Sequence, residues 1–317
     1  MTNWTFQRLF SRALDRDRFV QFIRESRDSN NEKEQVRVRS YLNPFSTVPH
    51  VVIPQSPWST LSDGEYTWVL NSRIGREQPA VAPISGGICS CKRHVEVGDG
   101  HHLRVCPCGG GPMIVHNDLR DRVHACIVNA GVSAQTEKPQ ILMDGNERPG
   151  DVVASGIGRG GSDLVIDLCC VDPHSQCSNA KRRKRARVVG AAASDAEEVK
   201  RNKRGGPHNW RMEDRVAAQG MEFLALGMEI SAATTSTCAN FLKKLSEIAH
   251  RRRGHNKSVF KRRWTIDWGM LIAKRGASVA LSRIITVIGE RKGFLGGSIV
   301  PMLSADAEPL LLEAGGG

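Results

Sequence analysis

Apolar residues recur at helical spacing in several stretches of the chain, and we expect these to be helices: 5–29, 61–75, 116–130, 211–219, 237–250 and 264–290. Runs rich in β-branched and other apolar residues predict strands at 134–142, 151–155, 162–171 and 221–230. The Pro-rich stretch 42–57 predicts a loop. A helix followed by three strands, with further helices around them, is typical of an α/β (α+β) protein.

Three other segments lack a regular pattern. Residues 86–112 are rich in Gly and Cys, so a bound metal is expected to hold them in place. Residues 172–206 are polar, and Lys181–Arg187 contains six basic residues in seven, so we expect a mobile insertion. The tail after Pro301 ends in three glycines and is expected to fray.

Composition favours a polyanionic partner. The chain has 317 residues, with 45 Lys and Arg against 33 Asp and Glu, a formal charge of +12. Such an excess neutralises phosphates, so nucleic acid is the expected partner, DNA or RNA. No apolar run reaches the roughly 20 residues of a membrane-spanning helix, and the polar N-terminus is unlike a signal peptide. We therefore expect a soluble intracellular protein without a membrane partner.

Cysteines and histidines between residues 89 and 108 have the spacing of a metal site. Cys89-x-Cys91 and His102-x3-Cys106 form two ligand pairs separated by ten residues. Three thiolates and one imidazole suit structural Zn²⁺ with tetrahedral geometry and leave no open position for catalysis. Cys108, His94 or His101 could replace one of the four ligands. The competing interpretation is a reduced Cys-rich loop without metal.

Two aspartates stand in the expected strands. Asp151 begins one strand, and Asp167 lies inside the next apolar run, where burying a carboxylate costs free energy. If these strands are antiparallel neighbours, both carboxylates can bind Mg²⁺ or Mn²⁺, with Glu137 as a third ligand. A hydrogen-bonded buried Asp167 and a surface Glu137 are the competing interpretations. His116 is expected to cap or pack its helix, or to support the zinc site.

Basic clusters are candidates for nucleic-acid contact. The tract Lys181, Arg182, Arg183, Lys184 and Arg185 fits a nuclear-localisation or phosphate-binding signal, or a solvated loop. Arg251, Arg252 and Arg253, followed by Lys257 and 261–263, could hold a nucleic-acid backbone. Phe260 and Trp264 among them are more simply explained by helix packing.

A series of motifs resembles one family over about residues 58–290. The motifs are Cys89-Ser-Cys91, 98–102 (Gly-Asp-Gly-His-His), Cys106, 115–121 (Val-His-Asn-Asp-Leu-Arg-Asp), Glu137-Lys-Pro139, Arg148-Pro-Gly-Asp151-Val and Val165-Ile-Asp167-Leu. Residues 217–223 and the closing helices are also similar. Together they resemble the C-terminal region of non-LTR retrotransposon reverse transcriptases that carry a restriction-enzyme-like endonuclease.

The resemblance implies a PD-(D/E)xK nuclease fold in which Glu137, Asp151 and Asp167 bind the catalytic metal and Arg148 lies near the nucleic acid. It also implies these parts: a helical extension at 1–85, a zinc knuckle at 86–115, a restriction-endonuclease-like core with a mixed sheet at 116–235, a disordered basic insertion at 173–206, C-terminal helices at 236–295 and a flexible tail at 296–317.

Two departures from the family pattern matter. Cys169 stands where many such nucleases have Lys, which leaves Lys200 or Arg211 as the basic residue. The chain also lacks a Tyr-x-Asp-Asp polymerase motif. The expected function is a Mg²⁺-dependent DNA endonuclease that nicks its target, in the nucleus. The alternatives are an inactive nucleic-acid-binding remnant and a purely structural remnant.

Overall fold

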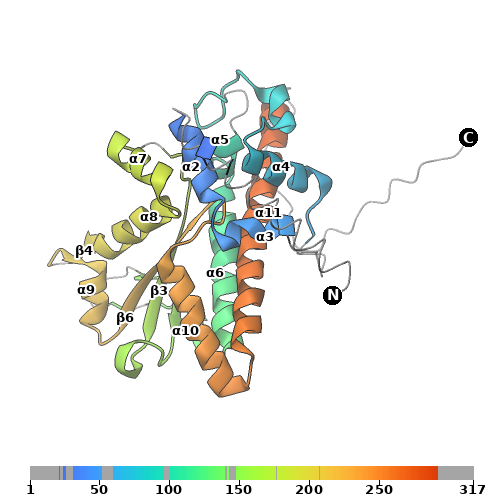
Figure 1. The fold of residues 1–317 in the computed structure, drawn as a ribbon. Helices are drawn as coiled ribbons and strands as arrows, with labels where there is room; N and C mark the ends of the chain where they lie inside the picture. Colours follow the sequence, from blue (N-terminus) through green and yellow to red (C-terminus); the bar gives the residue numbers. More distant parts are fainter. Residues whose placement is uncertain are drawn as a thin grey trace, which may run out of the picture.

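A four-stranded sheet lies beside long helices in the computed structural model of the chain (Figure 1). The structure describes residues 31–51, 60–95, 100–139, 141–142, 148–175, 177–206 and 208–291, with the isolated positions 21, 24 and 25. Most of the expected helix 5–29 and the whole tail 296–317 lie outside the described residues.

The sheet has the order β1-β2-β3-β6. These strands are β1 (Ala134–Thr136), β2 (Val152–Ala154), β3 (Leu164–Val171) and β6 (Glu222–Glu229). The pairs β1–β2 and β2–β3 are antiparallel, and β3–β6 is parallel. The expected mixed α/β architecture is therefore confirmed. The first predicted strand, 134–142, is shorter than expected.

Alternation along the strands creates two buried faces. Val152, Leu164 and Ile166 pack on one face against helices α6 (Gly111–Asn129), α10 (Ser236–Arg253) and α11 (Lys257–Arg291). Val153 and Val165 pack on the other face, against α9 (Met212–Ala217). Because side chains alternate, Asp151 and Asp167 belong to the second face.

The helical segment before the sheet differs from the sequence expectation in one place. Helices α2 (Glu32–Ser40) and α3 (Pro44–Val51) are present, so the predicted loop 42–57 is wrong for 44–51. Pro44 stands at the first helical position. A backbone N–H there would have no partner within the helix, so the N–H that proline lacks is not missed. The predicted helix 61–75 is confirmed as α4 (Asp63–Ile74), with Ser62 and Glu65 forming a capping box and Gly75 ending it at φ 72°.

The predicted mobile insertion, 173–206, is instead helical. It contains α7 (Asn179–Arg187) and α8 (Ala191–Asn202), followed by a hairpin of β4 (Arg204–Gly205) and β5 (Trp210–Arg211). The first turn of α8, Ala191–Ala193, is buried, and a Cβ on Gly227 of β6 would lie 2.4 Å from the Ala193 carbonyl oxygen. The polar composition of the segment does not predict this contact, because the interface is formed by small residues rather than by large apolar ones.

The remaining short elements are η2 (Pro79–Ile84), α5 (Gly100–Val105) and η3 (Arg159–Gly161). The basic link expected between the last two helices is mostly helical, because α10 runs to Arg253 and α11 begins at Lys257. Among the described helices, none combines the length and apolar character that crossing a membrane requires.

Candidate functional site

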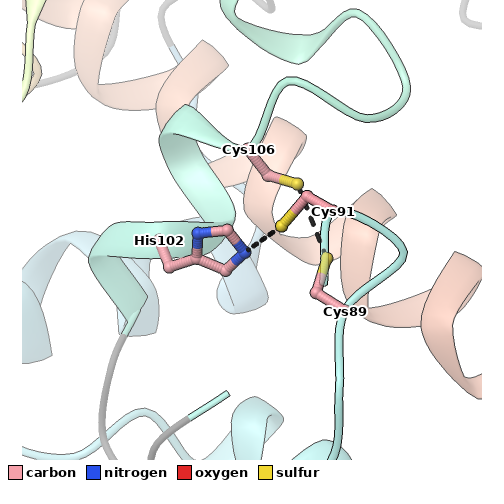
Figure 2. Close-up of side chains that lie close together, drawn as sticks. All are labelled: Cys89, Cys91, His102 and Cys106. Atoms are coloured by element: carbon pink, nitrogen blue, oxygen red, sulfur yellow. Dashed lines mark hydrogen bonds between the residues drawn. The ribbon is translucent and has the colours of Figure 1, made fainter. Parts of the chain in front are cut away.

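Four side chains of the Cys-rich segment converge, as Figure 2 shows. The Sγ atoms of Cys89, Cys91 and Cys106 and a ring nitrogen of His102 all lie within 4.8 Å of one another. Tetrahedral zinc with Zn–S bonds of about 2.3 Å would separate two sulfurs by about 3.8 Å. The observed Cys89 Sγ–Cys106 Sγ distance is 3.5 Å, and Cys91 Sγ lies 3.2 Å from His102 Nε2. The predicted ligands could therefore bind a metal such as zinc.

A tight turn and a short helix supply the two ligand pairs. Cys89 and Cys91 lie on a turn in which the Cys89 N–H donates to the Arg93 carbonyl at 2.8 Å, with Lys92 at φ 66°. His102 lies in α5, and Cys106 directly follows that helix. Cys108 is partly buried and is not in the cluster, while His94 is exposed. The side chain of His101 lies outside the described residues.

Helix α11 contacts the cluster through Arg283. Arg283 donates to Cys89 Sγ at 3.3 Å and to Ser90 Oγ at 2.5 Å. Burial raises the pKa of Cys89, but hydrogen bonds with the Cys91 backbone, Arg283, His102 and Cys106 together outweigh it and lower that pKa to about 6. Burial raises the pKa of the Cys106 thiol to about 12. A metal would bind both sulfurs as thiolates, since coordination removes the thiol proton.

The two predicted aspartates lie next to each other across β2 and β3. Val152 pairs with Ile166 in antiparallel register, so Asp151 and Asp167 are the next opposing positions. The Asp151 N–H donates to the Ile166 carbonyl at 2.8 Å. Burial and the neighbouring Asp151 carboxylate raise the pKa of Asp167 to about 6, although Lys200 opposes both. The two strands are antiparallel neighbours, which is the arrangement expected to bring the Asp151 and Asp167 carboxylates together.

His116 of α6 contacts the first aspartate. Its Nε2 lies 3.2 Å from Asp151 Oδ2, which also accepts a 2.7 Å hydrogen bond from the Leu168 N–H. The hydrogen bond with Asp151 raises the pKa of His116. The pKa of Asp151 is lowered, because His116 and the Leu168 N–H together outweigh burial, the largest single effect. His116 therefore orients Asp151 and does not belong to the Cys-rich cluster.

Lys200 is the basic residue at this site. Its Nζ donates to Asp167 Oδ1 at 2.9 Å, and 35% of its side chain is exposed. Helix α8 positions Lys200 because the buried Glu197 of that helix accepts hydrogen bonds from the Gly227 N–H at 2.9 Å and from Thr235 Oγ1 at 2.5 Å. The competing candidate, Arg211, is exposed and pairs with Asp214 through bonds of 2.7 and 2.8 Å.

Glu137 is engaged by two arginines. It forms ion pairs with Arg120 of α6 and with Arg148, the latter at 2.9 Å, and 46% of its side chain is exposed. Its N–H donates to the Asp151 carbonyl at 2.9 Å, so the backbones of the two acidic residues are adjacent. Its φ of 49° belongs to the left-handed region. In this structure Glu137 is therefore a surface charge paired with arginines, which is the competing interpretation given for it from the sequence.

The basic tract on α7 is only partly exposed. Lys181, Arg182 and Arg183 face solvent. Lys184 pairs with Asp195 at 2.7 Å. Arg185 is buried and donates to the Pro173 and Ser175 carbonyls, both at 3.1 Å. In this structure the Arg185 guanidinium therefore holds the preceding loop, and its contact with nucleic acid stays a prediction.

The tip of the α10–α11 hairpin carries the second basic cluster. Its exposed basic side chains are Arg251, Arg252, Arg253, Lys257, Lys261, Arg262 and Arg263. Arg252 also donates to the Gly131 carbonyl at 2.8 Å, at the end of α6. Phe260 and Trp264 are buried in the main core, which confirms the packing interpretation for both.

The sequence matches no protein-family model and no curated protein. Sequence reasoning missed the contacts of His116 and Arg120. Both lie in the 115–121 motif, four residues apart on α6, so helical spacing placed them on one side of the helix.

Proposed function

We propose that the chain is a metal-dependent endonuclease domain that hydrolyses phosphodiester bonds of DNA, of the restriction-like type found in non-LTR retrotransposon reverse transcriptases. The observation that carries the proposal is the meeting of Asp151, Asp167 and Lys200. Two carboxylates can hold a metal ion that activates water, and an ammonium beside them can stabilise the charge on a phosphate, which are the groups that metal-assisted phosphodiester hydrolysis uses.

The donor set fits a hard divalent cation. Burial is the main cause of the raised pKa of Asp167, and repulsion from the mostly buried Asp151 carboxylate adds to it. A cation between the two carboxylates would relieve that repulsion. Mg²⁺ and Mn²⁺ prefer such oxygen ligands. When bound, the metal would supply an activated water and stabilise the leaving oxygen. Lys200 would offset charge on the scissile phosphate, and His116 would keep Asp151 in its orientation.

Nicking of supercoiled plasmid tests the proposal. The full chain is incubated with Mg²⁺ or Mn²⁺ and compared with Asp151→Ala and Asp167→Ala. We expect metal-dependent relaxation of the plasmid in the wild type and a loss of at least about 100-fold in each variant. Equal metal-dependent nicking by all three purified proteins would contradict the proposed site.

A second candidate is a nucleic-acid-binding module that has lost catalysis. The ion pairs of Glu137 with Arg120 and Arg148 favour this candidate. Glu137 is the third expected metal ligand, and while paired with the arginines its carboxylate would not bind the metal. Glu137→Gln separates the two functions. An active enzyme that recruits Glu137 when DNA binds should lose nicking in this variant. A binding module should bind DNA unchanged and show no nicking in either form.

DNA binding in the nucleus is part of the same proposal. The formal charge of +12 and the exposed residues Lys181, Arg182 and Arg183 on α7 support it. The Cys-rich cluster, with zinc bound, would hold the segment before α6 and so fix the helix that carries His116.

A further inference from the structure

The β4–β5 hairpin presents a tryptophan to solvent. Trp210 of β5 is 48% exposed, whereas Trp68, Trp264 and Trp268 are at most 4% exposed. Large aromatic side chains are usually buried well beyond this level, because their apolar surface stabilises the fold. The fold makes little use of the Trp210 ring, so contact with a partner is the more natural explanation.

The hairpin register keeps the indole uncovered. Trp210 pairs with Gly205, which has no side chain to lie over the ring. The exposed His208 ring lies 5.3 Å from the Trp210 ring, centroid to centroid, at an interplanar angle of 33°. Two aromatic rings are therefore gathered at one exposed tip.

The base of this hairpin is held firmly. The buried Met212 donates its N–H to the Lys203 carbonyl at 2.7 Å, and Met212 and Val216 pack in the core on the second face of the sheet. On the other side, Glu197 ties α8 to β6. A rigid base presents the rings in a fixed position, which lowers the entropy cost of binding.

The charge around the rings suits a polyanion. Residues 199–211 contain five Lys or Arg residues and no acidic residue. Arg204 in β4 is exposed, and Arg201 is partly exposed. Lys200, four residues before Arg204, holds Asp167. The rings therefore stand among basic residues, on the hairpin that directly follows the helix carrying Lys200.

From these observations we propose that Trp210 stacks on an unpaired base of a nucleic-acid strand that crosses the acidic site. The inference rests on the proposed nuclease function and adds to it a preference for single-stranded or locally opened DNA. Aromatic stacking beside basic residues is the chemistry by which proteins hold unpaired bases, whereas bases inside a duplex are already stacked on each other.

Fluorescence anisotropy with a labelled single-stranded DNA oligonucleotide tests the inference, without added Mg²⁺ or Mn²⁺. We expect Trp210→Ala to weaken binding about tenfold, equivalent to about 1.4 kcal/mol, and Trp210→Phe to weaken it less, because a phenyl ring still stacks. Ile285→Ala, which removes another exposed apolar side chain (71% exposed), should bind as the wild type does. Thermal melting checks that every variant is folded.

Three results would overturn the inference: wild-type affinity in a folded Trp210→Ala protein, an equal loss of affinity for the matching duplex, or no single-strand binding by the wild type. The plasmid assay distinguishes this failure from failure of the proposed function. A wild type that nicks plasmid while Trp210→Ala binds normally contradicts the stacking role alone. A wild type that binds single strands through Trp210 but never nicks contradicts the endonuclease alone.

Discussion

Lys200 Nζ donates a 2.9 Å hydrogen bond to Asp167 Oδ1, although 33 residues separate the two along the chain. The coulombic attraction of Asp167 raises the pKa of Lys200 against the effect of burial, which is the largest and lowers it. Lys200 is thus held as a cation at a carboxylate that the proposal assigns to metal binding. In the proposed nuclease site, Lys200 would take the place of the motif Lys, since Cys169 stands at that position of β3.

Removing the Lys200 ammonium should abolish nicking without unfolding the chain. We expect Lys200→Ala to reduce the nicking rate at least about 100-fold, because a phosphate would lose its charge partner. Lys200→Arg should recover part of the rate. Time courses of plasmid relaxation, with thermal melting in parallel, measure both effects.

Arg211→Ala is the matched control for this prediction. Arg211 was the other basic candidate, but its guanidinium pairs with Asp214. We expect the variant to nick at the wild-type rate. Loss of activity in Arg211→Ala, together with an active Lys200→Ala, would reverse the assignment.

Zinc should be present at one atom per chain and should stabilise it. Cys91→Ser removes one ligand of the cluster, so we expect lost zinc and a melting temperature lower by roughly 5–10 °C. Cys108→Ser is the control. Cys108 lies outside the cluster, so this variant should keep its zinc. Elemental analysis and melting curves provide the readouts. Zinc lost from Cys108→Ser but retained in Cys91→Ser would contradict the ligand set.

The tip of the α10–α11 hairpin should contribute to the salt dependence of DNA binding. Arg251 and Arg253 are exposed, so we expect the double variant Arg251→Ala/Arg253→Ala to reduce the slope of log affinity against log salt by about 1–2. Arg252→Ala should also lower the melting temperature, since it loses the bond to the Gly131 carbonyl. An unchanged salt slope in the double variant would place the DNA elsewhere.

Glu229 should make stability depend on pH. Burial raises its pKa above the ordinary value of 4.5, although hydrogen bonds with Ser40 and the Ala192 N–H lower it. The folded chain therefore holds this proton more tightly than the unfolded chain. Its contribution is full below about pH 4.5 and is lost as the pH rises through the folded-state pKa.

Glu229→Gln removes this titration. We expect its melting temperature to fall less than that of the wild type between about pH 5 and about pH 8. Glu198→Gln, at an exposed position on α8, should follow the wild type. Parallel pH profiles for Glu229→Gln and the wild type would show that Glu229 remains ionised in the folded chain.

Local chemistry explains which features could be predicted from the sequence. The capping box at Ser62 and Glu65, the strands around Asp151 and Asp167, and the four cluster ligands depend on neighbours a few residues away or on short spacings. Patterns of this kind determine helix ends, strand alternation and ligand pairs before any distant contact forms.

Only the tertiary structure decided the contacts that cross the chain. Periodicity does not show that α8 packs through small alanines on Gly227, so the segment 173–206 was expected to be mobile. The same packing brings Lys200 to Asp167 and turns the buried Arg185 inward. The sequence by itself therefore determined the elements and the ligand types, whereas the packing of α6 and α8 against the sheet decided which side chains meet, because such contacts depend on shape at distant positions rather than on local pattern.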